Sequence, residues 1–289
     1  MQNLDENSIT EAVIASHECA PDGRLKAIVS CLVHHLHAFA REVGLTESEW
    51  DAGIRFLTDV GHATHERRQE FVLLSDTLGL SMLVTAMAHR KPDDCTQATV
   101  FGPFFVENAP AYQNGDDIAN GAIGEPCFVS GVVRGPDGQP LDGARIEVWQ
   151  ADAQGLYDVQ HASDGEQRAR GVLHTGPDGR YFFRSIVAEP YPIPHDGPVG
   201  RMLRALGRHP WRPAHLHFMI TAPGYDRLVT HVFREGDRYL DCDAVFGVRS
   251  SLIAPWIRHE GGRSPDGTMM SGPFSTLTFD FILSRSQCS

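Results

Sequence analysis

The first third of the chain repeats apolar residues with the period of helices. Over residues 25–43 they recur every three or four positions, which predicts a helix with one apolar stripe that ends near Gly44. Thr46 and Glu49 have the spacing of a capping box, so a second helix is expected to begin here. Its apolar stripe continues to Gly61.

A third helix is predicted over residues 66–89, where apolar residues again recur at three and four positions. Gly79 weakens it, because glycine is a poor helix former. The sequence Lys-Pro-Asp-Asp at residues 91–94 is expected to end it, since proline lacks an amide donor. Residues 1–98 are therefore predicted to form a helical domain.

From residue 99 onward the pattern changes to short apolar runs, several of them alternating, between turn residues. Pro-Asp-Gly turns occur three times, within residues 135–138, 176–179 and 264–267. The predicted strands are residues 128–133, 144–149, 181–186, 214–220, 228–233 and 277–283. So many short strands favour an antiparallel β-sandwich over residues 99–289, and hence an α+β chain that is mainly β. Residues 188–211, with five prolines and no periodicity, are expected to form a long ordered loop.

Charge and composition exclude several classes of protein. The 289 residues carry a net charge of −12 at pH 7, which disfavours nucleic acids and anionic membrane surfaces as partners. No apolar run approaches the roughly 18 residues that a membrane span needs. Residues 1–11 contain acidic residues where a secretory signal would be basic, so a cytoplasmic location is expected. The six scattered cysteines form no CxxC pair and are expected to be thiols.

Two histidines stand two residues apart in the run Arg-Pro-Ala-His-Leu-His, residues 212–217. The side-chain period of a strand is two, so His215 and His217 point from one face, about 6 to 7 Å apart along the chain. They can converge on one metal ion, or they can be two hydrogen-bonded histidines of a sandwich. No HxxE or HExxH motif lies nearby, which disfavours a zinc hydrolase.

Two tyrosines stand at turn positions, Tyr157 in Gly-Leu-Tyr-Asp and Tyr191 in Pro-Tyr-Pro-Ile-Pro. Tyrosines in such positions can also be packed loop anchors. Ionising a phenol with a pKa of about 10 at pH 7 costs roughly 4 kcal/mol, which only a strongly acidic ion offsets. Zinc and magnesium prefer other ligands, so two tyrosines with two histidines point to non-haem ferric iron.

The order of these motifs along the chain resembles that of the intradiol ring-cleaving dioxygenases. The matching segments are residues 141–152, 155–158, 179–183, 190–194 and 212–217. The resemblance extends over essentially the whole chain, because the helical N-terminal part is typical of the catechol 1,2-dioxygenase branch. It implies an oxidoreductase of aromatic catabolism, which opens an aromatic diol or triol with O2.

The resemblance also implies a set of site residues. One ferric ion per subunit would have four protein ligands, namely Tyr157, Tyr191, His215 and His217. Tyr191 corresponds to the family's displaceable tyrosine and Arg212 to the arginine beside the substrate ring, so both are expected to be catalytic.

Within the family, the chain is most similar to the branch that cleaves hydroxyquinol, benzene-1,2,4-triol, to 3-hydroxy-cis,cis-muconate, the enol form of maleylacetate. The implied substrate-binding residues are Leu73, Asp76, Val100, Phe101, Gly102, Pro103, Phe104, Ile193, Pro194, Arg212, His231 and Val245. Asp76 could accept a hydrogen bond from the third hydroxyl of the triol, although by sequence alone it also reads as an exposed helix acid. His231 is a departure, because catechol-cleaving relatives commonly have glutamine there.

Other interpretations stay open. The substrate could be catechol or a chlorocatechol, and a different class would be a metal-free β-sandwich binding module. The N-terminal helices could form a homodimer, since an amphipathic stripe that exceeds one core needs a partner. The resemblance supports this dimer and implies a phospholipid at its interface.

Overall fold

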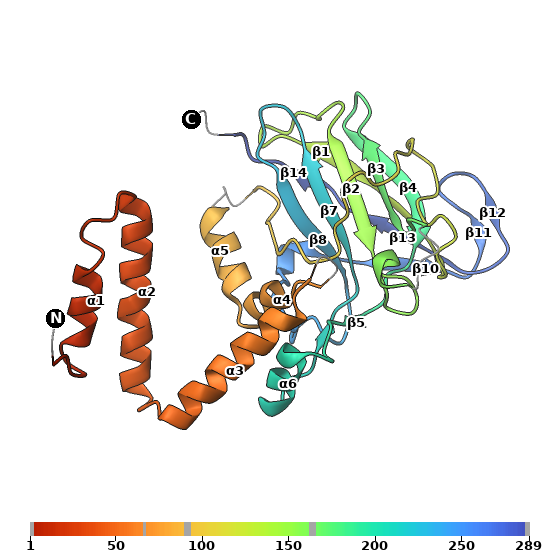
Figure 1. Cartoon of the computed structure of the whole chain (residues 1–289). Helices are drawn as coiled ribbons and strands as arrows, with labels where there is room; N and C mark the ends of the chain where they lie inside the picture. Colours follow the sequence, from red (N-terminus) through yellow and green to blue (C-terminus); the bar gives the residue numbers. More distant parts are fainter. Residues whose placement is uncertain (1–2, 66–67, 90–93, 162–165, 287–289) are drawn as a thin grey trace. The chain divides into compact units, whose positions relative to one another are not determined.

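The computed structural model describes residues 3–65, 68–89, 94–161 and 166–286 (Figure 1). The predicted start of the third helix at Glu66 and most of its predicted end, Lys91 to Asp93, lie outside these residues. The chain divides into two compact units, Met1–Asp59 and Val60–Ser289.

The first unit is helical, as predicted. It contains α1 (Ile9–Ala15), α2 (Gly23–Glu42) and most of α3 (Glu47–Ala63). The side chain of Asp22 caps α2 by accepting from the backbone amides of Arg24 and Leu25. The capping box before α3 is confirmed, because the Thr46 amide donates to Glu49 Oε2 at 2.9 Å and the Glu49 amide to Thr46 Oγ1 at 3.3 Å.

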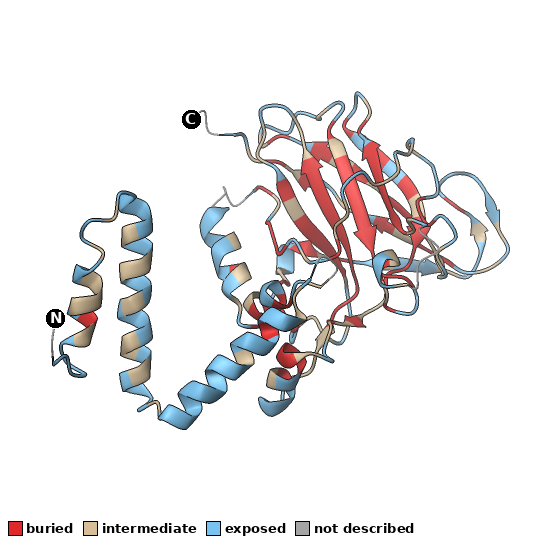
Figure 2. Ribbon diagram, in the orientation of Figure 1, coloured by how far each residue is buried: buried red, intermediate tan, exposed pale blue. Residues whose placement is uncertain are grey.

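The apolar stripe of α2 faces outward. Its six members are between 48 and 55% exposed, and they are Leu25, Ile28, Leu32, Leu36, Phe39 and Val43. Helix α1 bonds to a different side of α2, where Arg41 Nη2 donates to Thr10 Oγ1 at 2.6 Å. Figure 2 shows no buried residue along α2. Within the first unit, this apolar face is therefore left uncovered.

The third predicted helix is two helices, which corrects the prediction of one. Helix α4 (Glu70–Thr77) and helix α5 (Leu80–Ala88) meet at a bend of 78°. The break falls at Gly79, whose φ of +77° is in the left-handed region that glycine adopts without strain. Among the described residues no single helix is long and apolar enough to cross a membrane, although this bent pair passes that test by length and composition.

Two five-stranded sheets form the sandwich of the second unit (Figure 1). The first has the order β3 (Arg170–His174), β2 (Arg145–Gln150), β7 (His215–Thr221), β8 (Leu228–Arg234), β9 (Ile253–Ala254). The second has the order β10 (Trp256–His259), β13 (Phe274–Thr278), β1 (Pro126–Arg134), β14 (Phe281–Ile282), with β4 (Arg180–Ile186) also paired to β1. The inner faces meet in one core that includes Val129, Phe183 and Phe218.

Most predicted strands and all three Pro-Asp-Gly turns are present. Each turn closes with a backbone hydrogen bond from its last glycine to its first residue, at 2.8 to 3.0 Å. The prediction of one strand over residues 277–283 is wrong, because the chain leaves β13 after Thr278 and re-enters the sheet as β14. Strand β3 had not been predicted, and the sheets are mixed, because β1 runs parallel to β13 and β14 and β8 runs parallel to β9.

Residues 188–211 are more regular than the predicted loop. They contain α6 (Pro198–Ala205) and β5 (Tyr191–Pro192), which pairs with β6 (Trp211–Arg212). Proline at the first turn of α6 is compatible with a helix, since no intrahelical amide is lost there. The remaining short elements are η1 (Asp158–Gln160), η2 (Ser250–Leu252), β11 (Gly262–Arg263) and β12 (Met269–Met270).

Strand β7 separates the core from the candidate site. Leu216 and Phe218 point into the sandwich core. Because successive side chains of a strand alternate, His215 and His217 point from the opposite face of the same sheet. The core thus fixes the position of the two histidines from behind.

The substitution Gly131→Ala tests how closely the second sheet is packed. A Cβ atom at Gly131 would overlap the carbonyl oxygen of Phe279 and lie 2.9 Å from the Tyr181 ring. We expect a loss of about 1 to 3 kcal/mol in the free energy of unfolding, measured by urea denaturation. Gly272→Ala is the control, because its Cβ meets no atom within 4 Å. Equal stability of the two variants would contradict this packing.

Candidate active site

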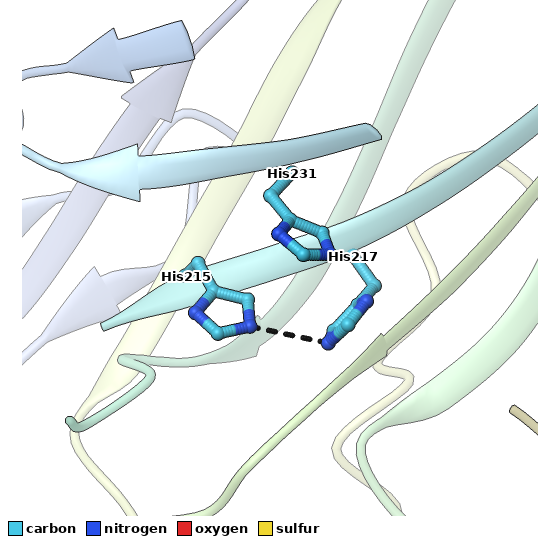
Figure 3. A group of neighbouring side chains, drawn as sticks. All are labelled: His215, His217 and His231. Carbon is cyan, nitrogen blue, oxygen red and sulfur yellow. Dashed lines mark hydrogen bonds between the residues drawn. The ribbon is translucent and has the colours of Figure 1, made fainter. Parts of the chain in front are cut away.

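Three histidines form a cluster on the outer face of the first sheet (Figure 3). Strand β7 provides His215 and His217, and His231 lies directly opposite His217 on β8. All three side chains are buried, and their nearest ring nitrogens lie within 4.8 Å of one another. His215 Nε2 and His217 Nε2 are 3.1 Å apart, the contact that is dashed in Figure 3.

The tautomer of His215 is set by the backbone. Its Nδ1 lies 2.7 Å from the carbonyl oxygen of Pro213, which can only accept, so Nδ1 carries the proton and the lone pair of Nε2 faces His217. A metal-binding histidine is usually oriented in this way, by a hydrogen bond from the ring nitrogen that does not bind the metal.

Tyr157 completes the convergence of donor atoms. Its hydroxyl lies 2.9 Å from His217 Nε2, the same atom that faces His215. If His217 Nε2 is protonated, it can donate to His215 Nε2 but cannot accept a hydrogen bond from the Tyr157 hydroxyl. If it is unprotonated, its lone pair faces the lone pair of His215 Nε2. A shared cation resolves this conflict, and ligands about 2.1 Å from an ion lie about 3 Å apart. The three donor atoms therefore fit a metal ion.

Packing holds the Tyr157 ring in place. The residue is the N-cap of η1, and its amide donates to Gln160 Oε1 at 3.0 Å. The ring of Phe104 stacks on it with centroids 4.4 Å apart. The next residue, Asp158, forms a buried ion pair with Arg170, whose Nη2 also donates to the Phe104 carbonyl at 3.1 Å. These contacts tie the segment around Phe104 to the tyrosine.

Tyr191 and Arg212 reach the cluster together because they are opposite residues of the β5–β6 pair. Arg212 Nη1 lies 3.5 Å from the Tyr191 hydroxyl and 3.4 Å from His215 Nε2. The rings of Tyr191 and Tyr157 are edge to face, with centroids 5.3 Å apart. The structure thus brings both tyrosines, two histidines and the arginine of the sequence prediction to one place.

Burial controls the protonation of this cluster. Desolvation, followed by the charge of Arg212, holds the pKa of His215 well below its usual value. Desolvation, followed by neighbouring histidines, does the same to the pKa values of His217 and His231. The imidazoles are therefore neutral near pH 7 and their lone pairs are free to bind a metal. Desolvation, followed by Tyr191, raises the pKa of the Tyr157 phenol well above 10, so its ionisation requires a nearby cation.

A cavity of about 580 Å³ lies between α4, α5 and residues 100–105. Five of the predicted substrate-binding residues line it, and these are Asp76, Val100, Phe101, Gly102 and Pro103. Gly102 lies between the cavity and the histidines, because a Cβ atom at this lining residue would be 3.0 Å from His217 Cε1. Its φ is +77°.

Asp76 is not the exposed helix acid that the sequence alone allowed. Its side chain is buried, and desolvation raises the pKa of its carboxyl group, while the charge of Arg212 lowers it and that of Asp243 raises it. A buried acid that faces a cavity is suited to hydrogen bonding with a polar group of a ligand.

The other predicted substrate-binding residues lie outside the described lining of this cavity. Leu73 is buried on α4, Ile193 is buried after β5, and Pro194 is partly buried beside it. Val245 is buried, and its amide donates to Asp243 beside Arg212. Phe104 packs against both tyrosines.

Sequence reasoning missed two residues of the site. Trp149 stacks on His217 with centroids 4.7 Å apart, and it lies opposite His217 in the β2–β7 register. The carboxylate of Asp243 pairs with Arg212, with Nε 3.0 Å from Oδ1. Strand alternation could have indicated Trp149, but Asp243 lies in an irregular segment that has no sequence signal.

Known proteins resemble this chain over nearly its whole length. Two family models match the chain, "Catechol dioxygenase N terminus" over residues 22–96 and "Dioxygenase" over residues 100–285. The chain is 59% identical to 6-chlorohydroxyquinol 1,2-dioxygenase of Cupriavidus pinatubonensis, over 98% of this chain and 99% of that protein. It is 55% identical to hydroxyquinol 1,2-dioxygenase of Nocardioides simplex, over 98% and 96% respectively.

The fold also matches a solved structure of the same kind. The structure of hydroxyquinol 1,2-dioxygenase from Pseudomonas putida DLL-E4 has a TM-score of 0.90 and 45% identity, covering 97% of this chain and 99% of that one. The matched family models and the near-complete relatives thus show that the chain belongs to the intradiol ring-cleaving dioxygenases, a family of enzymes that implies a metal cofactor.

Proposed function

We propose that this protein cleaves hydroxyquinol between its adjacent hydroxyl groups with O2. The product is 3-hydroxy-cis,cis-muconate, the enol form of maleylacetate, and both oxygen atoms of O2 are retained in its two carboxyl groups. The observation that carries this proposal is the convergence of Tyr157, His215 and His217 next to a cavity that contains the buried Asp76. The names of the relatives described above support the choice of substrate.

The metal is proposed to be one ferric ion per subunit, with Tyr157, Tyr191, His215 and His217 as its protein ligands. Two buried phenols favour a hard trivalent ion over zinc or magnesium, for which such ligands are unusual. When bound, the ion would supply a Lewis acid and a template for the diol. His231 lies in the same cluster, but its ring stacks on His215 and its Nδ1 is 3.4 Å from Arg212 Nη2, so we assign it to substrate binding.

Tyr191 and Arg212 are proposed to be the catalytic pair. A diol that binds as a dianion loses two protons, of which the Tyr191 phenolate accepts one and hydroxide supplied by solvent would accept the other. Arg212 Nη1 lies beside this hydroxyl and provides fixed positive charge where negative charge develops on the ring. Because Arg212 is buried, solvent screens this charge little.

Asp76 is proposed to select the triol. Its carboxylate accepts a hydrogen bond from the third hydroxyl, and a substrate that lacks this hydroxyl leaves a buried polar group unpaired. The apolar residues Val100, Phe101 and Pro103 line the same cavity and suit an aromatic ring. Catechol and chlorocatechols are the alternative substrates.

The exposed stripe of α2 is proposed to form a homodimer interface. A stripe of six half-exposed apolar residues is an unusual surface for a monomer, and a second copy of the helix offers a matching apolar face. A phospholipid could occupy the same interface with its acyl chains.

We also propose a cytoplasmic location. The chain is proposed to divide into a helical domain, residues 1–98, and a catalytic sandwich, residues 99–289.

Replacing each tyrosine tests the metal site. We expect wild-type protein to carry iron and a visible tyrosinate-to-iron band that shifts when hydroxyquinol is added without O2. Tyr157→Phe should lose most of the iron, whereas Tyr191→Phe should keep it and lose turnover by about 10²-fold or more, since it lacks the proton acceptor. Elemental analysis, absorption and O2 uptake measure these effects. A Tyr191→Phe protein with wild-type turnover would eliminate the acceptor role, and a wild-type protein that stays colourless with added ferric iron would eliminate the metal site.

Asp76→Asn tests substrate selection. We expect kcat/KM for hydroxyquinol to fall by about 10- to 100-fold, because one charged hydrogen bond is lost. The value for catechol should change much less. Thr85→Val is the matched control, since it alters the polarity of the same cavity without removing a charge. Equal losses for the two substrates would show that Asp76 does not read the third hydroxyl.

Leu32→Glu tests the interface. A charge in the middle of the apolar stripe should convert a dimer into a monomer of 31.8 kDa, measured by light scattering after size-exclusion chromatography. His34→Glu is the control, because His34 is exposed and lies away from the stripe. Lipid extracted from the wild-type dimer and absent from Leu32→Glu would support the phospholipid. A monomeric wild-type protein would exclude the interface.

A further inference from the structure

Arg212 is a buried cation that faces one carboxylate, that of Asp243. Arg212 Nε lies 3.0 Å from Asp243 Oδ1, and Nη2 lies 3.2 Å from Oδ2. Both side chains are only 2% exposed. This is the two-point geometry in which a guanidinium has one fixed orientation relative to its carboxylate partner.

We propose that Asp243 is the positioning residue for Arg212, an inference that rests on the catalytic role proposed above for this arginine. Asp243 occupies the edge of the guanidinium formed by Nε and Nη2. Nη1 then faces the proposed metal ligands, where it lies 3.5 Å from the Tyr191 hydroxyl and 3.4 Å from His215 Nε2, while Nη2 also lies 3.4 Å from His231 Nδ1. The carboxylate thus decides which nitrogen is directed at the reacting groups.

The carboxylate is itself held by the backbone. Asp243 Oδ1 also accepts from the Val245 amide at 3.3 Å, and Oδ2 accepts from the Gly247 amide at 2.9 Å. Each oxygen therefore accepts one guanidinium N–H and one backbone N–H. Rotation of the carboxylate would break both sets of bonds, so Asp243 is a rigid partner.

The segment that carries Asp243 is fastened to the strand that carries Arg212. The Ala244 amide donates to the Trp211 carbonyl at 3.1 Å, directly beside Arg212. Arg208 Nη2 donates to the Ala244 carbonyl at 3.0 Å, and its Nη1 donates to the Thr77 carbonyl at the end of α4 at 2.7 Å. The pair is therefore positioned by three separate segments of the second unit.

Space around the pair is limited. A Cβ atom at Gly247 would lie 2.9 Å from Arg212 Nη2 and 3.1 Å from both Asp243 Oδ2 and Thr99 Oγ1. The absence of a side chain at this position lets the backbone amide reach Oδ2 while Arg212 packs against it. An added methyl group would push the guanidinium without changing any charge.

The negative charge of Asp243 also stabilises the buried positive charge of Arg212. Burial alone would lower the pKa of the Arg212 guanidinium, but the negative charge of Asp243, followed by Tyr191, raises it above its usual range. A metal cation beside Tyr191 would repel an unpaired arginine, and Asp243 offsets this repulsion. Without Asp243, the Arg212 side chain would be free to turn away from the position proposed for the substrate ring.

Asp243→Asn tests this role, because it keeps the shape and one acceptor oxygen but removes the charge. We expect kcat for hydroxyquinol to fall by about 10²-fold, since a small displacement of a catalytic group has that effect. Iron content and the resting absorption band should stay at wild-type values, because no metal ligand is changed. A merely structural role would lower protein yield and iron together.

A double-mutant cycle with Arg212→Met decides whether Asp243 acts through the arginine. The double variant should be no slower than Arg212→Met alone. If the two losses in kcat multiplied, or if Asp243→Asn kept wild-type kcat, the proposal would be overturned. Gly247→Ala provides an independent variant, which should lower kcat with both charges intact. If it were stable and fully active, the close packing of the pair would not matter for positioning.

Glu70→Gln is the matched control for loss of a buried carboxylate that is paired with an arginine. Glu70 accepts from Arg68 Nε at 2.8 Å and from the Val199 amide at 3.1 Å, and its side chain is fully buried, but the structure records no contact with Arg212 or the histidine cluster among the described residues. It should lower stability and leave kcat within about two-fold, as expected for a structural pair outside the site. Faster turnover of catechol than of hydroxyquinol would contradict the proposed substrate, and the cycle would then be measured with catechol. Cleavage of neither substrate by the wild-type protein would overturn both proposals.

Discussion

The cross-strand register of β2, β7 and β8 is the constraint on which the site depends. It aligns Trp149, His217 and His231 in one row across the sheet. Leu216 and Phe218 alternate with the histidines and pack into the sandwich core. A shift of one residue in β7 would exchange the two sets, placing polar rings in the core and apolar ones in the site. The stability of the core therefore also fixes the geometry of the histidines.

Burial then gives this row its chemistry. Neutral imidazoles and an un-ionised phenol are the stable forms in a dry environment, as the shifted pKa values of His217 and Tyr157 indicate. Donor atoms that converge in this state have lone pairs to share. The same residues on an exposed surface would bind water instead, so the sandwich and its covering segments make the site suitable for a metal.

The two buried arginines of this region each have a carboxylate partner. Arg170 is paired with Asp158 behind Tyr157, and Arg212 is paired with Asp243 beside Tyr191. An unpaired buried charge would be strongly destabilising, so each arginine needs its carboxylate in order to be present at all. The two pairs also anchor the segments that bring the tyrosines to the sheet.

Local sequence patterns determined much of the fold and part of the site. Helical periodicity identified α2 and α3, the Thr46 capping box marked where α3 begins, and alternation identified strand β7 with its two histidines. The patterns failed where local signals conflict with packing. Gly79 breaks a helix that its neighbours would continue, and the prolines of residues 188–211 concealed α6 and the β5–β6 pair. In both cases the outcome depends on contacts that no short window of sequence contains.

The sequence by itself determined the family, the helical and sandwich segments, and the identity of the residues around the cluster. Only the tertiary structure decided that Asp76 is buried at a cavity, that Trp149 stacks on His217, and that Asp243 holds Arg212. The physical reason is separation along the chain. Asp243 lies 31 residues after Arg212, beyond β7, β8 and the irregular segment that follows β8. Whether its carboxylate meets the guanidinium depends on the folded path of the whole segment rather than on a periodic pattern.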